Sequence, residues 1–281
     1  MGNTHRFQID DINCIVLEEG TIVSDFNISD VLQRYPNATE EEIQDALKYI
    51  EIDDGKMQNY LNTLYIETGD TKILVDAGMG HNPERPDIGK TVAALASEEI
   101  KPEDIDIVYI THFHGDHYMG LLSNGEATFP NARYLTLDDE WNYWLSEDAR
   151  ENMAERVQGI LNVVTSLEDK FSTVSAGDEL APGVNVMAIP GHTMGQSAIK
   201  IESGDEMVIH LVDLLHSTAQ FRYPDWHFVW DTDGELAVQS RRAQLANAVN
   251  RNYMVMFYHL PFPGLGHVER DGQNYKWIPL S

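Results

Sequence analysis

Four side chains of the kinds that bind metal ions fall within six residues, in the segment His112-Phe113-His114-Gly115-Asp116-His117. With 11 histidines in 281 residues, the pattern HxHxDH arises by chance in only about one such chain in a thousand. Alternate side chains of an extended segment point the same way, so His112 and His114 can bind one ion. Asp116 and His117 lie beyond the turn at Gly115 and can face a second ion. Imidazole and carboxylate suit Zn²⁺, Mn, Fe or Co, and the single cysteine excludes a thiolate site.

Other residues of ligand type follow apolar segments that are predicted as strands. The segments, each with the residue that follows it, are 105–110 with His112, 184–189 with His192, 207–212 with Asp213, and 254–258 with His259. Functional sites are usually built from loops on a rigid scaffold. We therefore expect these residues in one site at one edge of the sheets. His267 could compete with His259 as a ligand, and His210, inside a predicted strand, is interpreted as a core histidine.

The remaining pattern predicts strands and helices without strict alternation. Further strands are expected over 5–18, 60–68 and 72–75, and helices over 28–50, 87–99, 137–168 and 234–250. Thr39 and Glu42 form a capping-box pattern within the first helical segment. Two sheets packed on each other with helices outside satisfy this order. We predict one domain over residues 1–281.

Composition narrows the class of protein. A hydrophobic share of 42% is enough for a large core, and no run of eighteen apolar residues predicts a transmembrane helix. The first residues lack the charged and apolar regions of a secretory signal. Cys14 is the only cysteine and lies among apolar residues, which favours a buried thiol in a reducing compartment. The predicted location is cytoplasmic.

The charge is strongly negative: 19 Lys plus Arg against 46 Asp plus Glu give a formal net charge of −27. Such a surface repels phosphate backbones and anionic membranes, so we expect no nucleic-acid or membrane partner. An anionic substrate would meet the same repulsive field. The charge therefore favours a small, neutral, apolar substrate.

The segment THFHGDH resembles the signature of the metallo-β-lactamase superfamily. Four further segments resemble the other motifs of that family in the same order: Val75-Asp76-Ala77-Gly78, Pro190-Gly191-His192-Thr193, Val212-Asp213 and Tyr258-His259. The likeness runs from about Leu61 to the C-terminus. It implies an α+β fold, an αββα sandwich, with a dinuclear metal site at one edge of the two sheets. One departure is Val212, where the family usually has glycine.

The resemblance also implies a role for each ligand. His112, His114 and His192 would hold the first of two divalent ions, with zinc expected before cobalt, iron or manganese. The second ion would be held by Asp116, His117 and His259. Asp213 would bridge the two ions, and Asp76 would lie behind the ligands and orient one of the histidines. The implied chemistry is hydrolysis, with Asp116 passing a proton to the leaving group.

Within the superfamily, the chain is similar to the branch of acyl-homoserine lactonases and methyl-parathion-type organophosphate hydrolases. The segments that carry this likeness are Asp213-Leu-Leu-His216 and the run from His259 to His267. Many lactonases have a tyrosine three residues after the bridging aspartate, where this chain has His216. A histidine can also donate a hydrogen bond to an oxyanion, although a purely structural polar contact is the alternative for His216.

This branch implies an N-terminal helical arm at about 19–60 that contributes to a homodimer contact and to an acyl pocket. Phe26 and Met57 from the arm, and Phe262 after His259, are the candidate pocket residues. The expected activity is opening of N-acyl-homoserine lactone rings, a quorum-quenching reaction, with phosphotriesterase as a side activity. The alternatives are an organophosphate or aryl-ester hydrolase, a glyoxalase II-like thioesterase, and a non-catalytic metal-binding sensor.

Overall fold

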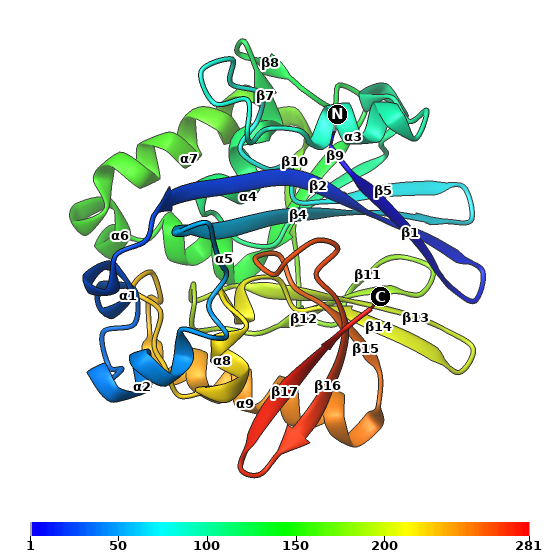
Figure 1. Cartoon of the computed structure of the whole chain (residues 1–281). Helices are drawn as coiled ribbons and strands as arrows, with labels where there is room; N and C mark the ends of the chain where they lie inside the picture. The colour runs from blue at the N-terminus through cyan, green and yellow to red at the C-terminus, as the bar shows by residue number, and fades with distance from the viewer. Residues whose placement is uncertain (1, 281) are drawn as a thin grey trace.

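Two β-sheets face each other in the middle of the molecule, and helices cover the outer side of each (Figure 1). The structure, a computed structural model, describes residues 2–280. Apolar side chains such as Val16 and Ile66 from one sheet and Val186 and Ile199 from the other form the core between the sheets. The four layers make an αββα sandwich, which confirms the predicted fold class.

The first sheet comes from the N-terminal half of the chain. Its strand order is β1-β2-β4-β5-β6-β9-β10, with β3 paired to β4. The strands are β1 (Thr4–Ile9), β2 (Ile12–Asp25), β3 (Ile52–Asp53), β4 (Lys56–Thr68), β5 (Thr71–Val75), β6 (Ile107–Ile110), β9 (Arg133–Leu137) and β10 (Phe171–Val174). The pairs β5–β6 and β6–β9 are parallel. Parallel neighbours end at the same edge of a sheet, so the residues that follow β5 and β6 meet there.

The second sheet comes from the C-terminal half, in the order β11-β12-β13-β14-β15-β16-β17. Its strands are β11 (Glu179–Ala181), β12 (Val184–Ala188), β13 (Ser197–Ser203), β14 (Glu206–His210), β15 (Met254–Met256), β16 (Leu265–Asp271) and β17 (Asn274–Pro279). β14 and β15 are parallel and their ends lie together. A small hairpin, β7 (Leu122–Ser123) and β8 (Glu126–Ala127), stands apart from both sheets.

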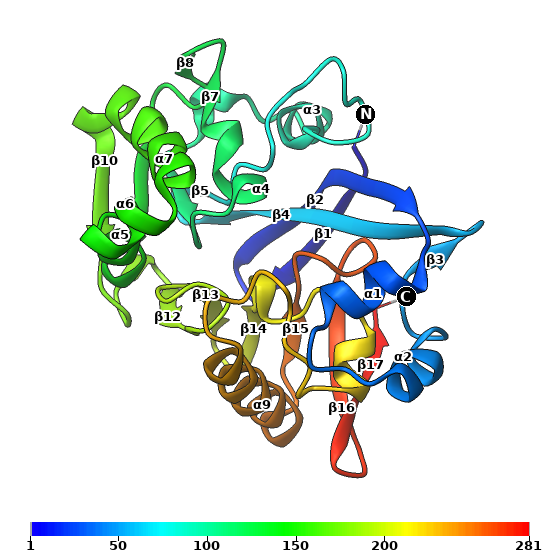
Figure 2. The ribbon, with the colours of Figure 1, turned by 90° about the vertical axis from the view of Figure 1, so that its left-hand side faces the viewer.

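Helices form the outer layers and bury their apolar faces on the sheets (Figure 2). Over the first sheet lie α3 (Thr91–Ser97), α4 (Gly115–Tyr118), α5 (Asp138–Trp144), α6 (Glu147–Asn152) and α7 (Ala154–Ser166), and over the second α8 (Ala219–Arg222) and α9 (Gly234–Arg251). Trp144 and Ile160 pack into the first outer core, and Leu245 into the second. Within residues 2–280, no helix is long and apolar enough to span a membrane.

The N-terminal arm is less helical than expected, because both of its ends are strand. β2 and β4 pair as far as Asp25 opposite Lys56, so they continue beyond β1 and β5 as a ribbon, which β3 joins at its tip. Only α1 (Ile28–Arg34) and α2 (Glu40–Ala46) between them are helical. The capping box begins α2 as expected: Glu42 N donates to Thr39 Oγ1 at 3.2 Å, and Thr39 N donates to Glu42 Oε2 at 2.9 Å.

Other boundaries also differ from the predictions. The strand expected over 5–18 is two strands, because the chain reverses at Asp10, whose φ is +50°. The helical stretch expected over 137–168 is three short helices, α5 to α7. The expected strands that precede the ligand residues are all present, each one or two residues short at one end, and β14 also begins one residue earlier than expected.

Candidate metal centre

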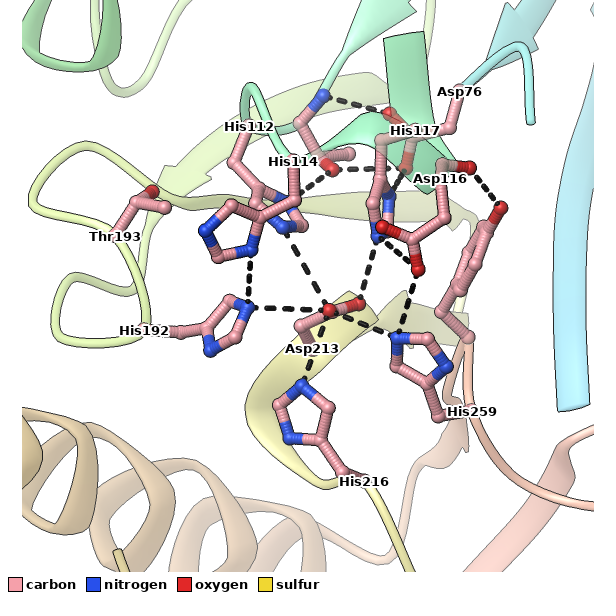
Figure 3. Close-up of polar contacts among 12 residues, drawn as sticks. Asp76, His112, His114, Asp116, His117, His192, Thr193, Asp213, His216 and His259 are labelled. Carbon is pink, nitrogen blue, oxygen red and sulfur yellow. Dashed lines mark hydrogen bonds and ion pairs between the residues drawn. The ribbon is translucent and has the colours of Figure 1, made fainter. Parts of the chain in front are cut away.

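The seven residues predicted as metal ligands converge at one edge of the sandwich, where strands of both sheets end (Figure 3). They form two groups in which the ligand atoms lie within 4.8 Å of one another: His112, His114, His192 and Asp213 in one, and Asp116, His117 and His259 in the other. His267 lies in β16, outside both groups. His210 is buried in β14, as expected of a core histidine. The division of these residues between two ion sites remains a prediction, and each of the two groups could hold one ion.

Asp213 lies at the centre of this cluster, and its two carboxylate oxygens face different imidazoles (Figure 3). Oδ1 is 3.3 Å from His117 Nε2, whereas Oδ2 is 3.3 Å from His192 Nε2. Oδ2 also lies 3.7 Å from His112 Nε2 and 3.0 Å from His259 Nε2. A carboxylate placed in this way reaches ligands of both groups, as a bridge between two ions must.

The backbone beside Asp213 is strained. Val212 has a φ of +49°, in the left-handed region that β-branched residues rarely adopt. This position is the one where the family usually has glycine, which enters that region without steric cost. The valine side chain is buried against Leu61 and Tyr258. Strained residues of this kind gather at functional sites, where the surrounding packing holds them in place.

Hydrogen bonds behind the cluster fix the orientation of the imidazoles. His117 Nδ1 bonds Asp76 Oδ2 at 2.8 Å, and His259 Nδ1 bonds the Tyr60 carbonyl at 2.9 Å. His192 Nδ1 bonds Asp231 Oδ1 at 2.9 Å. In each case Nδ1 is engaged and Nε2 is left for the centre. Partners of this kind hold metal-binding histidines in one orientation.

The unpaired polar atoms of the cluster fit bound cations. His112 Nε2, His117 Nε2 and Asp213 Oδ1 are buried without a hydrogen-bond partner. Buried polar groups are nearly always paired, so such atoms need an explanation. Imidazole nitrogens and carboxylate oxygens directed at one point are the donor set that zinc and its neighbours take. The residues present therefore fit a divalent metal centre.

The protonation states of the cluster histidines also fit a divalent metal centre. Burial lowers the pKa of the His112 and His114 imidazoles and keeps them neutral, which is the form that binds metal. Burial also lowers the pKa of His192, but Asp213 and Asp231 outweigh it and raise that pKa to about 9. The carboxylates thus draw positive charge into the centre. A divalent cation supplies such charge at the same place.

A cavity of about 430 Å³ opens on the cluster, within the range of small-molecule sites. Beyond the cluster residues it is lined by Ile22, Arg34, Asn59, Met79, Phe113, Tyr118, Arg156, Phe228 and Trp230. The candidate pocket residues Phe26, Met57 and Phe262 are not among its lining residues. Met57 lies two residues from Asn59 on the same strand, where it packs with Phe26 in the core of the arm. Phe262 packs against the core between the sheets.

The family model described as the metallo-beta-lactamase superfamily matches residues 59–277. The chain belongs to this superfamily.

Relatives of the superfamily with assigned names include lactonases. An N-acyl homoserine lactonase from Bacillus cereus is 25% identical over 214 residues, which are 69% of this chain and 78% of that protein. The solved structure of AidC, a dizinc quorum-quenching lactonase in complex with a product, has 25% identity and a TM-score of 0.89, and the match covers 100% of this chain and 98% of AidC. The hydrolase AbOPH has 26% identity and a TM-score of 0.87, with 100% and 98% covered.

One match is short. The exodeoxyribonuclease WalJ of Streptococcus pneumoniae is 43% identical over 61 residues, which are 21% of this chain and 20% of that protein. The chain therefore spans about a fifth of the length of that relative. Such a match covers only a part of either protein.

His216 borders both the cluster and the cavity. Its Nε2 lies 3.2 Å from Asp213 Oδ2, and neither ring nitrogen has a hydrogen-bond partner. Burial lowers the pKa of His216 to about 3, so the ring is neutral. The imidazole stacks on Phe228 with ring centroids 3.7 Å apart. His216 also groups with Asp213 and His259 in ligand geometry, so its position fits either a hydrogen-bond donor or a further ligand.

Two buried carboxylates that support the cluster were not expected from the sequence. Asp231, from the loop before α9, orients His192. Glu140, in α5, accepts hydrogen bonds from Phe113 N at 2.7 Å, Thr193 Oγ1 at 2.6 Å and Gly195 N at 3.1 Å. It therefore ties the loop of His112 and His114 to the loop of His192. The sequence offers no signal for either residue, because both lie in ordinary acidic stretches far from the motifs.

Proposed function

We propose that this protein is a dinuclear-metal hydrolase that opens the lactone ring of N-acyl homoserine lactones. The observation that carries the proposal is the complete set of seven ligand-type residues at the base of a largely apolar cavity. The full-length similarity to AidC, which is named as a dizinc lactonase with a product bound, supports the choice of substrate. A second copy of the chain as a homodimer partner remains a prediction.

Each residue of the site has a task in this reaction. His112, His114 and His192 would hold one divalent ion, Asp116, His117 and His259 would hold the other, and Asp213 would contact both. A pair of such ions makes a water nucleophilic near neutral pH and neutralises charge that develops on the substrate. Zinc is the proposed metal.

The remaining steps fall to side chains at the cavity wall. The neutral His216 ring can donate a hydrogen bond to the oxygen that becomes negative when the lactone carbonyl is attacked. Asp116 is partly exposed in the cavity, with 21% of its side chain accessible, so it can pass a proton to the leaving alkoxide. Tyr258 donates from its hydroxyl to the Asp116 carbonyl at 2.6 Å and holds that loop in place.

The test is acid release by zinc-loaded protein with short- and long-chain acyl homoserine lactones. The expected result is kcat/KM above about 10⁴ M⁻¹s⁻¹, the low end for true substrates. No acid release from a protein with two ions per chain would overturn the lactonase proposal. The same preparation would then be assayed with phosphotriesters and aryl esters, because His216 occupies a position that resembles the organophosphate-hydrolase side of the branch.

A further inference from the structure

The wall of the cavity beyond the ligand cluster carries positive charge and no negative charge. Its charged members are Arg34 in α1 and Arg156 in α7. The carboxylates that line the cavity, Asp116 and Asp213, both belong to the cluster. The chain as a whole has 46 acidic residues against 19 Lys plus Arg. The part of the wall beyond the cluster therefore has the opposite charge balance from the protein as a whole.

Aromatic rings hold the two guanidinium groups in place. Arg34 Cζ lies 5.9 Å from the centre of the Phe228 ring, and Arg156 Cζ lies 4.7 Å from the centre of the Trp230 ring. Such contacts orient a guanidinium but leave its N–H donors free for another partner. Phe228 in turn stacks on His216, which contacts the cluster. The two arginines thus belong to the same wall as the reacting centre.

Neither guanidinium is neutralised by the protein. Among the described side chains, no carboxylate oxygen lies within 4.0 Å of Arg34 or Arg156. By contrast, the neighbouring surface pair Arg242 and Asp225 lies at 2.5 Å. The N–H groups at the cavity are therefore available to a ligand.

For a ligand inside the cavity, charges close to it matter more than the net charge of the whole protein. Interactions between exposed charges are largely screened beyond about 8–10 Å at physiological ionic strength. The two arginines line the cavity, so they act on a ligand there more strongly than charges farther away on the surface. The net charge of −27 acts on its approach more than on its binding.

We propose that Arg34 and Arg156 form a subsite for a carboxylate on the acyl part of the substrate. The preferred substrates are then lactones or esters whose acyl chain carries a terminal carboxylate. The lactone part of this inference rests on the proposed function, whereas the subsite itself does not. An acyl chain with a terminal carboxylate takes the place of the neutral, apolar substrate that the net charge suggested.

The experiment compares two lactones of equal chain length, N-hexanoyl and N-adipoyl homoserine lactone, which differ in the terminal carboxylate. The zinc-loaded wild-type protein is expected to show a kcat/KM at least about tenfold higher for the adipoyl compound. The preference should shrink as salt is raised from low to high concentration. Arg34→Gln and Arg156→Gln should each reduce it, mainly through KM of the adipoyl compound.

Arg150→Gln is the matched control, because Arg150 lies in the neighbouring helix α6 and does not line the cavity. It should leave the preference unchanged. Equal kcat/KM for both lactones in the wild type would overturn the subsite. The subsite would also be overturned if Arg34→Gln and Arg156→Gln left the preference for the adipoyl compound as unchanged as Arg150→Gln does.

Failure of the lactonase proposal is separable from failure of the subsite. If no lactone is opened, the same comparison is made with the p-nitrophenyl esters of pentanoate and of glutarate, which again have equal chain length. If no ester is cleaved either, calorimetry compares binding of the butyl half-amide of adipic acid with binding of N-butyl hexanamide. Tighter binding of the acid that is lost in the double variant Arg34→Gln/Arg156→Gln, but kept in Arg150→Gln, supports the subsite. Equal binding in all proteins overturns it.

Discussion

The base and the mouth of the cavity are built in different ways. At the base, His112 and His117 are fully buried, and hydrogen bonds with Thr111 and Asp76 hold their rings. At the mouth, Trp230 is 53% exposed and makes a cation–π contact with Arg156. The base is thus buried and held by hydrogen bonds, while the mouth is open to solvent. We infer that the base determines the reaction and the mouth determines which substrates are bound well.

The largest effect is expected from Asp213→Ala, which removes the carboxylate at the centre of the base. Four ligand histidines lie within 3.7 Å of its oxygens. Even residues behind a metal ligand contribute about 10–100-fold to affinity or activity, so turnover should fall by more than that. Bound zinc, measured by elemental analysis, should fall with it.

Asp233→Ala is the control for this variant. Asp233 caps α9 by accepting a hydrogen bond from Leu236 N at 3.0 Å. Its loss should cost about 1 kcal/mol of stability without a change in zinc content. If Asp213→Ala kept wild-type turnover, the dinuclear mechanism would be wrong.

The next effect concerns Glu140, which joins the two loops that carry the proposed ligands of the first ion. A glutamine has one acceptor oxygen and would turn an amide N–H₂ towards a donor. Glu140→Gln should therefore lower the affinity for the first ion by about 10–100-fold and change the second less. A cobalt titration that resolves the two sites measures both affinities without any assay of activity.

Glu19→Gln is a matched comparison for Glu140→Gln. Glu19 is also buried and also accepts from two backbone amides, Met79 N at 2.6 Å and Gly89 N at 2.8 Å, but it bonds neither ligand loop. The Glu19→Gln variant should have a lower midpoint temperature of unfolding, while its affinity for the first ion stays near the wild-type value. Equal losses of affinity in both variants would show that Glu140 matters only for stability.

The same contrast between base and mouth explains what could be predicted from the sequence. The ligands are close to recognisable motifs, and each follows a short strand, so residue type and spacing were enough to place His192 and Asp213 in one site. The αββα architecture followed from the resemblance and is confirmed by the family match and the two sheets.

The side chains at the mouth are brought together by contacts between segments far apart in the sequence, which no local sequence pattern predicts. Arg34 and Phe228 are in contact because the arm packs against the loop before α9. Phe26 and Met57 are candidate pocket residues because the resemblance implies an N-terminal arm that contributes to the acyl pocket. In the structure α1 and α2 cover that part of the ribbon, so these side chains fill the arm instead. Glu140 was missed for the same reason, since its partners outside α5 come from two loops that are distant in the sequence.

His216 lies between the two regions, and its replacement distinguishes two roles. If it donates to the oxyanion, His216→Ala should lower kcat by about 10²–10³-fold with zinc content unchanged. His216→Gln, which keeps an N–H donor, should recover part of the loss. A drop in bound zinc for both variants would instead assign His216 to the metal ligands.

The smallest effect is expected at the mouth, from Trp230→Leu. An exposed cation–π contact contributes about 0.5–1 kcal/mol, so release of Arg156 should raise KM for an adipoyl substrate by about 2–5-fold and leave kcat unchanged. Tyr49→Leu is the control, because Tyr49 is also exposed and has Lys48 Nζ 5.0 Å from its ring centre, but it does not line the cavity. Substitutions on the surface usually change stability by less than about 0.5 kcal/mol, so both variants should unfold near the wild-type temperature. If Trp230→Leu lowered kcat or bound zinc as strongly as a change at the base, the mouth would be part of the catalytic machinery, and the division drawn between the two regions would fail.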